Sequence, residues 1–114
     1  MLFRSPAAEL HRDGVEAILE HVPAGADYIL TIDVDGLDPS VAPACGSPLP
    51  DGLTFAEASG IVRGLAAKGR IVGVDVVEMM PSLDVNGITA MAATRLILHA
   101  LGGIVRSGQL KSPA

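Results

Sequence analysis

Two aspartates at the end of an apolar run are the residues of this sequence best suited to chemistry. Asp33 and Asp35 follow the apolar residues that begin at Tyr28. Side chains two apart on a strand point to the same side, so both carboxylates are expected at one face of the strand's carboxyl end. Because two convergent carboxylates repel each other, and because a charge interrupting an apolar strand is costly, we predict that they bind a hard divalent cation. The alternative is a simple turn at Asp35-Gly36 with Asp33 as a strand-end cap.

A second acidic site is expected at the end of the next apolar run. Glu78 closes the segment that begins at Ile71, and a carboxylate there could receive a planar guanidinium through two parallel hydrogen bonds. The alternative is a solvated acid at a strand terminus. Asp75 lies mid-strand and is expected at most to anchor a loop, and Asp38 precedes Pro39 and is expected to form a turn.

The histidines and the cysteine offer less. His11, His21 and His99 have no metal-type spacing, so any metal site is expected to use carboxylates or to be completed by another polypeptide. His99 is expected to be a packed or surface residue of a helix. Cys45 lies in a proline-rich loop without a neighbouring histidine and is expected to be a bystander thiol.

These residues need a scaffold, and the apolar periodicity predicts one. The capping box formed by Thr54 and Glu57 marks one helix start, and Gly69 is expected to end that helix in a left-handed conformation. The expected elements, in order, are a helix over about residues 7–22, a strand over 28–34 buried on both faces, a long loop over 36–53, a helix over 55–68, a strand over 71–78, and a helix from Ile88 to Gly102-Gly103.

This order predicts an α/β architecture. A strand, a crossover helix and a second strand form a right-handed unit with parallel strands, and ligands bind at the carboxyl ends of such strands. Two strands are fewer than the five or six of a typical sheet, so we expect the sheet to be incomplete.

Composition bounds the functional class. The chain has 114 residues, a net charge of -5 and 49% hydrophobic residues, which suits one domain or a piece of one. The acidic balance and the dispersed basic residues argue against nucleic acid and anionic membranes as partners. No apolar stretch is expected to reach the length of a membrane span, and the lone Cys45 favours a reducing, cytoplasmic location.

Two segments resemble a known family. Residues 31–54, TIDVDGLDPSVAPACGSPLPDGLT, and 73–93, GVDVVEMMPSLDVNGITAMAA, resemble the carboxyl-terminal half of the ureohydrolases, the arginase and agmatinase family. The stretch over 84–90 is nearest to agmatinase-like members. The resemblance implies a three-layer αβα parallel sheet, incomplete here, with residues 1–114 as a single partial ureohydrolase domain.

The resemblance also implies a chemistry. Asp33 and Asp35 match two ligands of a binuclear Mn²⁺ centre, and Glu78 matches the glutamate that receives the guanidinium. The implied reaction is manganese-dependent hydrolysis of an agmatine-like guanidino compound to urea and an amine. The family's other ligands, a His and an Asp-x-His-x-x-x-Asp segment, lie in an amino-terminal half that this chain lacks. We therefore expect the chain to be inactive alone and to need that missing half or a homo-oligomer.

Two alternatives stay open at this point. One is a non-catalytic binding or assembly module that keeps the fold and has lost the chemistry, because an incomplete sheet with an exposed edge invites pairing with another chain. The other is a small phosphohydrolase that uses Asp33, since haloacid dehalogenase-like phosphatases also carry an Asp-x-Asp pair after an apolar strand. Their motif usually continues with Thr-Leu, whereas Leu37-Asp38-Pro39 follows here.

Overall fold

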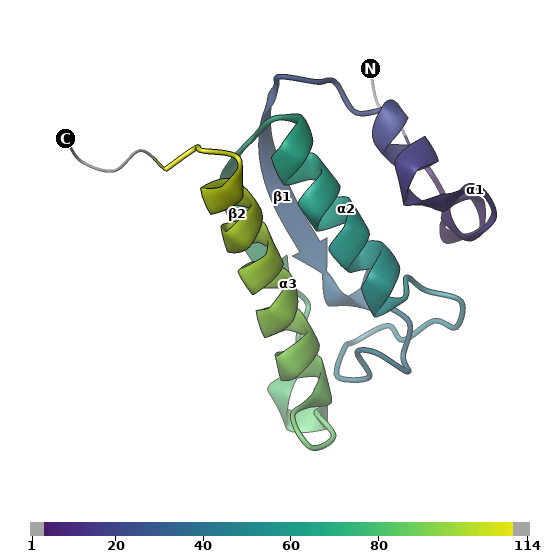
Figure 1. Ribbon diagram of the computed structural model, residues 1–114. Helices are drawn as coiled ribbons and strands as arrows, with labels where there is room; N and C mark the ends of the chain where they lie inside the picture. Colours follow the sequence, from purple (N-terminus) through teal and green to yellow (C-terminus); the bar gives the residue numbers. More distant parts are fainter. Residues whose placement is uncertain (1–3, 111–114) are drawn as a thin grey trace.

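The computed structural model describes residues 4–110 and has two parallel strands covered by helices. Helices α2 and α3 lie side by side on one face of the sheet, and α1 packs beside α2 (Figure 1). This is the α/β class expected for an incomplete αβα fold. The elements are α1 (Ala7–Glu20), β1 (Asp27–Asp33), the 3-10 turn η1 (Val34–Gly36), α2 (Phe55–Lys68), β2 (Arg70–Val77), the 3-10 turn η2 (Pro81–Leu83) and α3 (Ile88–Arg106).

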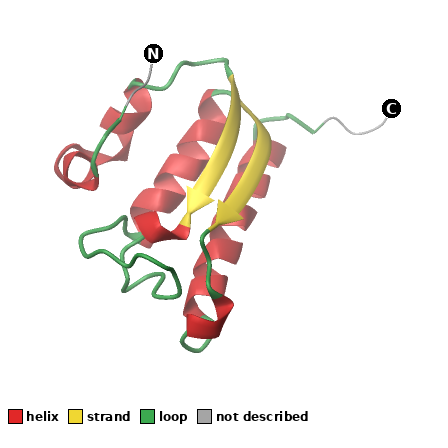
Figure 2. Ribbon diagram, turned by 180° about the vertical axis from the view of Figure 1, so that it is seen from behind, coloured by secondary structure: helices red, strands yellow, loops and turns green. Residues whose placement is uncertain are grey.

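Within residues 4–110, the helices cover the sheet on one face only. Ile32 of β1 points toward the helices and is buried, whereas Ile29 is 77% exposed. Figure 2 shows the strands lying in front of the helices, with the other sheet face open. The prediction that the first strand is buried on both faces is therefore wrong for this structure, because α2 and α3 both pack against the same side.

Helix α2 begins as predicted and ends differently. The Thr54 hydroxyl accepts a hydrogen bond from the Glu57 amide at 3.1 Å, and the Glu57 carboxylate accepts one from the Thr54 amide at 2.9 Å. Gly69 has an extended backbone with φ -161° rather than the predicted left-handed one. Glycine suits this position for another reason: a Cβ would collide with the carbonyl oxygen of Ala26 and the ring of Tyr28.

Helix α3 is apolar on two sides. Its inner side is buried against α2 and β2, while Met91 and Leu98 on its outer side are more than half exposed. The inner residues are Thr89, Ala92, Ala93, Leu96 and Ala100.

Helix α3 also runs further than predicted, through Gly102-Gly103 to Arg106. Its 19 residues are long and apolar enough to cross a membrane by length and composition alone, with 28% of the apolar window buried within the structure. The expectation that no segment reaches that length is therefore corrected. The glycines taken as helix breakers are accommodated because Gly103 lies directly against Ala66 of α2, where a Cβ would clash.

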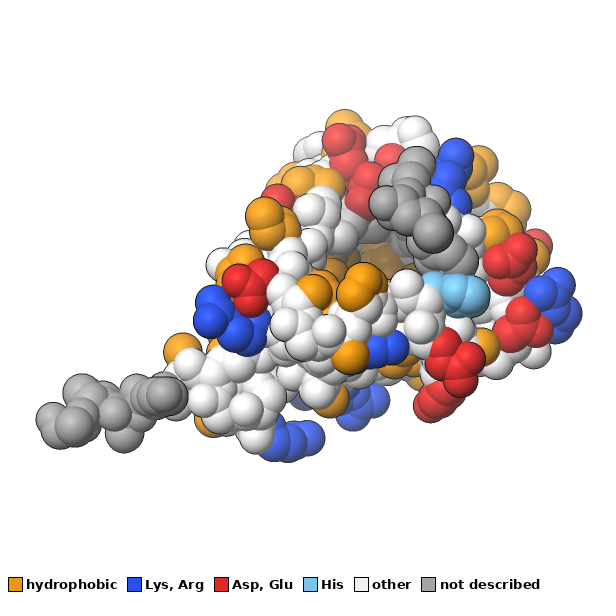
Figure 3. Space-filling view, turned by 90° about the horizontal axis from the view of Figure 1, so that it is seen from above, with side chains coloured by type: hydrophobic (Ala, Val, Ile, Leu, Met, Phe, Trp, Pro, Cys, Tyr) orange, Lys and Arg blue, Asp and Glu red, His pale blue; other side chains and the backbone are white. Residues whose placement is uncertain are grey.

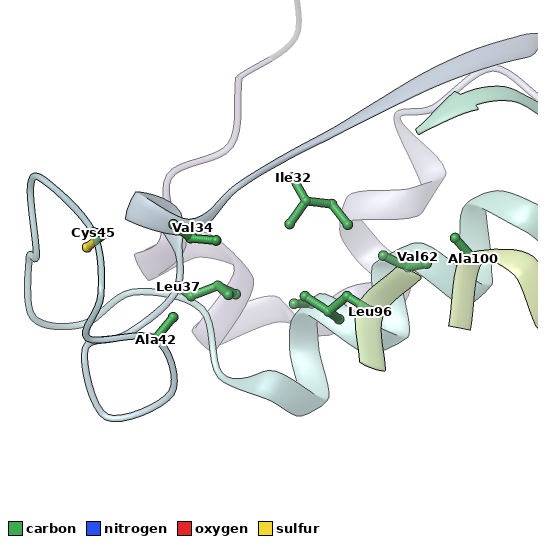
Figure 4. Close-up of a cluster of buried hydrophobic side chains, with 9 residues drawn as sticks. Ile32, Val34, Leu37, Ala42, Cys45, Val62, Leu96 and Ala100 are labelled. Carbon is green, nitrogen blue, oxygen red and sulfur yellow. The ribbon is translucent and has the colours of Figure 1, made fainter. Parts of the chain in front are cut away.

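The hydrophobic core extends from the helices into the loop that follows β1. Figure 4 shows Leu96 and Val62 of the helices in line with side chains of that loop. The charged groups lie outside this core, and acidic and basic side chains are interspersed at the end where the strands begin (Figure 3). The buried cluster comprises Ile32, Val34, Leu37, Ala42, Cys45, Ala58, Val62, Leu96 and Ala100.

Candidate metal centre

The two candidate metal ligands are brought together by a turn rather than by strand alternation. Asp33 is the last residue of β1, but Asp35 lies inside η1, so the expectation that both project from one strand face is corrected. The Asp33 carboxylate oxygen Oδ1 accepts a hydrogen bond from the Asp35 amide at 2.9 Å. Asp33 therefore caps the turn, as the alternative interpretation of the sequence foresaw, and its other carboxylate oxygen has no hydrogen bond among the described residues.

Asp35 carries the strongest indication of a missing ligand. Its carboxylate oxygen Oδ1 is buried and has no hydrogen-bond partner among residues 4–110. An acceptor buried without a partner costs about 1–3 kcal/mol, and more if it is charged. A divalent cation would satisfy this oxygen, because hard cations prefer carboxylate ligands. The residues present therefore fit a metal at this position.

Cys45 forms part of the same surroundings as the two aspartates. It is 3% exposed and forms a backbone bridge with Met79, which follows Glu78. Burial raises the pKa of the Cys45 thiol, and a side-chain hydrogen bond to the Asp35 carboxylate raises it further, although Asp35 Oδ1 has no hydrogen-bond partner among the described residues. A raised pKa keeps the thiol protonated near neutral pH and so argues against a nucleophilic role.

The loop after η1 is closed at its neck by backbone hydrogen bonds. The Asp38 amide donates to the Leu53 carbonyl and the Leu53 amide donates to the Gly36 carbonyl, both at 2.9 Å. A Cβ at Gly52 would come within 3 Å of the Asp38 backbone, so only glycine fits this crossing without a shift. Asp38 forms the predicted turn: its carboxylate accepts from the Ser40 amide at 2.9 Å and the Ser40 hydroxyl at 2.6 Å.

The far side of the loop is fixed to α3 by a buried contact that sequence reasoning missed. The Ala44 amide donates to the Thr89 hydroxyl at 3.0 Å, and the Ala44 carbonyl accepts from the Met80 amide at 2.9 Å. The Thr89 side chain has no solvent exposure. The loop is therefore held both to the start of α3 and to the segment that carries Glu78.

Asp84 fixes Thr89 in turn. Its two carboxylate oxygens accept from the amides of Thr89 and Ala90 at 2.9 and 3.0 Å, which supplies a cap that Gly87, at the cap position itself, cannot provide. Desolvation opposes the effect, but these amide donors lower the pKa of Asp84 and keep it ionised. An aspartate just before an apolar helix was the available sequence signal.

Glu78 follows β2 at the same sheet edge as the aspartates, because its neighbour Val77 pairs with Asp33. Glu78 is exposed and has a left-handed backbone with φ 65°. A residue with a side chain in this conformation is strained, and such strain clusters at functional sites. Asp75, by contrast, lies opposite Thr31 and is exposed, where no described residue forms a hydrogen bond with it.

Two of the histidines have partners other than these carboxylates. His99 is a packed residue as expected, with its Nδ1 at 2.6 Å from the Ser59 hydroxyl. His11 bonds Glu57 at 2.7 Å. Within the part of the chain that the structure describes, no group of three or more His, Cys, Asp or Glu side chains is arranged to hold a metal ion.

Comparisons with known proteins agree on a family. A model of the arginase family matches residues 4–102. The chain is 44% identical over 95 residues to an agmatinase of Chromobacterium violaceum, and the match covers 81% of this chain and 29% of that protein. It is 34% identical over 99 residues to the N(1)-aminopropylagmatine ureohydrolase of Thermus thermophilus, covering 85% of this chain and 32% of that protein.

The solved structures give the same result. A hypothetical agmatinase from Burkholderia thailandensis superposes with a TM-score of 0.81 at 39% identity, and the match covers 91% of this chain and 34% of that chain. This chain therefore spans about a third of the length of the proteins that it matches.

Proposed function

This chain belongs to the arginase family, and on that premise we propose that it supplies part of a metal-dependent site for hydrolysis of a guanidino compound. In this proposal Asp33 and Asp35 are two metal ligands and Glu78 binds the substrate guanidinium. The observation that carries the proposal is the buried Asp35 Oδ1, which has no hydrogen-bond partner among the described residues. The family match favours this function over a phosphohydrolase that uses Asp33.

Manganese is the proposed metal, as a binuclear centre in the complete site. A bound divalent metal would lower the pKa of water and so supply a nucleophile near neutral pH. The chain's own contribution is to hold the Asp33–Asp35 turn in one geometry. The capping hydrogen bond at 2.9 Å between Asp33 and the Asp35 amide serves that purpose.

Glu78 is proposed to orient the substrate. A carboxylate can accept two parallel hydrogen bonds from a guanidinium, which fixes both the position and the plane of that group. The left-handed backbone at Glu78, with φ 65°, sets the direction in which this side chain leaves the sheet edge. The proposed substrate is agmatine-like, and the proposed products are urea and an amine.

The chain alone is proposed to be inactive. Two carboxylates are fewer than the ligands needed for a binuclear centre, and the chain spans about a third of its relatives. We propose that a further polypeptide segment, or another copy in a homo-oligomer, supplies the remaining ligands. We also propose that the protein is cytoplasmic.

Metal binding can be tested directly. We expect the chain to bind Mn²⁺ weakly in an electron paramagnetic resonance titration, and Asp35→Asn to weaken binding at least tenfold. Asp38→Asn is the matched control, because Asp38 is a half-buried turn residue whose carboxylate bonds Ser40. Equal binding by Asp35→Asn and the unchanged chain would overturn the ligand assignment.

Activity can be tested by complementation. The chain is mixed with the amino-terminal part of the Chromobacterium violaceum agmatinase, and urea release from agmatine is measured with Mn²⁺ present. We expect turnover from the mixture, none from either part alone, and a loss of at least 100-fold with Glu78→Gln. Turnover by the chain alone that Asp33→Asn abolishes would contradict the proposed incompleteness. A folded mixture without turnover would instead favour a non-catalytic module.

A further inference from the structure

We propose that a groove between α2 and α3 binds a small dianion, such as a phosphate or a dicarboxylate. The groove has a volume of about 570 Å³ and lies on the side of the helix pair that carries the exposed Leu98. Its residues come from both helices and from the turn that ends α3: Arg63, Ala67, Leu98, His99, Gly102, Gly103, Arg106 and Ser107. The inference does not depend on the proposed function.

The charge of the groove is opposite to that of the chain. The sequence has 13 acidic and 8 basic residues, yet the groove is lined by two arginines and by no aspartate or glutamate. Arg12 and Arg70 each form an ion pair with a nearby aspartate. Arg63 and Arg106, like Arg95, are exposed and form none among the described residues, so their guanidinium groups can donate to a ligand in the groove.

The histidine of the groove is fixed by its neighbours. Its Nδ1 lies 2.6 Å from the hydroxyl of Ser59, which is 2% exposed, and its ring packs at 5.8 Å from that of Phe55. The Nε2 of His99 has no hydrogen bond to any described residue. When the Ser59 hydroxyl donates to Nδ1, the proton of the neutral ring lies on Nε2, which can then donate to an oxyanion.

Small residues make room for the ligand. Gly103 packs directly on Ala66 and brings the two helices close together beneath the groove. Ala67 and Gly102 line the groove with little or no side chain, and a Cβ at Gly102 would meet nothing within 4 Å. Two guanidinium groups beside such a groove suit a compact oxyanion, because each can donate two parallel hydrogen bonds to oxygen atoms.

The groove is separate from the candidate metal centre. It lies at the end of the molecule where α2 and α3 finish, beside the start of β2, whereas Asp33 and Glu78 lie at the opposite end of the strands. Interaction with the helix dipole explains a cation in the last turn, which applies to Arg106. It does not explain Arg63, which lies in the middle of α2, or the immobilised His99.

Titration of the whole chain with inorganic phosphate and with malonate tests the proposal. Amide and imidazole NMR signals are followed without Mn²⁺ at constant ionic strength with chloride. We expect saturable shifts at His99 and Ser107, and at least fivefold weaker binding in Arg63→Ala and in Arg106→Ala. Arg95→Ala is the matched control, because Arg95 is an exposed arginine of α3 that does not line the groove.

Each outcome has a defined meaning. Binding of phosphate alone identifies a phosphate-type ligand, binding of malonate alone identifies a dicarboxylate, and binding of both identifies recognition by charge. Arg63→Lys keeps the positive charge, and we expect its affinity for the anion to lie between that of Arg63→Ala and that of the unchanged chain. The proposal is overturned if neither anion produces saturable shifts, or if Arg95→Ala weakens binding as much as Arg63→Ala.

Discussion

The loop over 37–53 and helix α1 are attached to the rest of the molecule in opposite ways. The loop has no long regular element, yet Leu37 and Ala44 are buried and its backbone bonds to η1, to Met80 and to α3. Helix α1 is regular except at Gly14, but Leu10 is its one buried residue and it packs mainly against α2. Burial and partnered backbone groups, rather than regular secondary structure, therefore decide which segment is held rigidly.

The difference matters for the candidate site. The loop brings Cys45 beside Asp35, and a metal or substrate site needs a supporting shell held to within a fraction of an ångström. Helix α1 carries no candidate site residue and tolerates a kink, with Gly14 at φ 86°. The loop and the helix should therefore respond differently to substitution and to pH.

Truncation of one leucine in each region compares their packing directly. We expect Leu37→Ala to lower the free energy of unfolding by about 2–5 kcal/mol, because Leu37 is 3% exposed in the core. Leu19→Ala in half-buried α1 is expected to cost about 1 kcal/mol. Urea denaturation followed by circular dichroism measures both values. Equal losses would contradict the contrast.

Removal of the buried hydroxyl tests how the loop is fixed to α3. Thr89→Val keeps the side-chain shape but leaves the Ala44 amide without its acceptor at 3.0 Å. We expect a loss of about 1–3 kcal/mol in unfolding free energy, together with faster hydrogen exchange of that amide. Thr89→Ser, which retains the hydroxyl, is the control. Unchanged exchange at Ala44 in Thr89→Val would show that the contact does not hold the loop.

Relief of backbone strain at Glu78 tests the sheet edge beside which the loop is held. Glu78→Gly is expected to stabilise the fold by up to about 1 kcal/mol, because glycine adopts φ 65° without strain. Thermal unfolding of Glu78→Gly and Glu78→Gln measures the difference, and the glutamine variant keeps the strain. A fold stabilised by loss of Glu78 would mean that the side chain is retained for binding rather than for stability. Destabilisation by glycine would refute the strain.

The attachment of α1 should depend on pH. The hydrogen bond to Glu57 raises the pKa of His11 above 6.5. The stability that protonated His11 adds to the fold is therefore complete below pH 6.5 and is lost as the pH rises through the raised pKa. Partial burial raises the pKa of Glu57, but its bonds to His11 and Thr54 outweigh this and lower it below 4.5. The stability that ionised Glu57 adds to the fold is complete above pH 4.5 and is lost as the pH falls through the lowered pKa of Glu57.

The pair is therefore strongest between about pH 4.5 and 6.5. Hydrogen exchange in α1 as a function of pH measures the effect, with exchange in α3 as the internal reference, because the loop itself bonds His11 through the Asp51 carbonyl. We expect protection of α1 to fall between pH 6.5 and 8 in the unchanged chain and to stay level in His11→Ala. A fall of the same size in His11→Ala would exclude His11 as the cause.

The sequence was sufficient for the elements and for the edge at which the carboxylates gather. Apolar periodicity placed both strands and all three helices, and the Thr54 and Glu57 spacing gave the start of α2 because a capping box is a local interaction. Asp33 and Glu78 were placed at one edge because parallel strands end on the same side. The assignment of Asp33, Asp35 and Glu78 to metal and substrate stays a prediction.

What sequence reasoning missed depends on contacts between distant residues. The role of Thr89 rests on Ala44, which lies 45 positions earlier. The continuation of α3 past Gly102 rests on packing against α2, because local propensity disfavours glycine in a helix but a close helix contact requires it. The placement of Asp35 inside η1 was missed because an alternating strand pattern does not reveal where a strand gives way to a turn.

The hydrogen bond from the Asp35 amide to Asp33 bears on how substitutions in this lineage should be interpreted. An oxygen at position 33 serves the turn whether or not a metal is bound, so selection for folding alone retains Asp, Asn or Ser there. The buried Oδ1 of Asp35 serves no such hydrogen bond among the described residues. In a relative that has abandoned metal chemistry, position 35 would therefore drift first. If Asp35 is a metal ligand, the residue at 35, rather than the one at 33, is expected to distinguish a working ureohydrolase from a decayed copy.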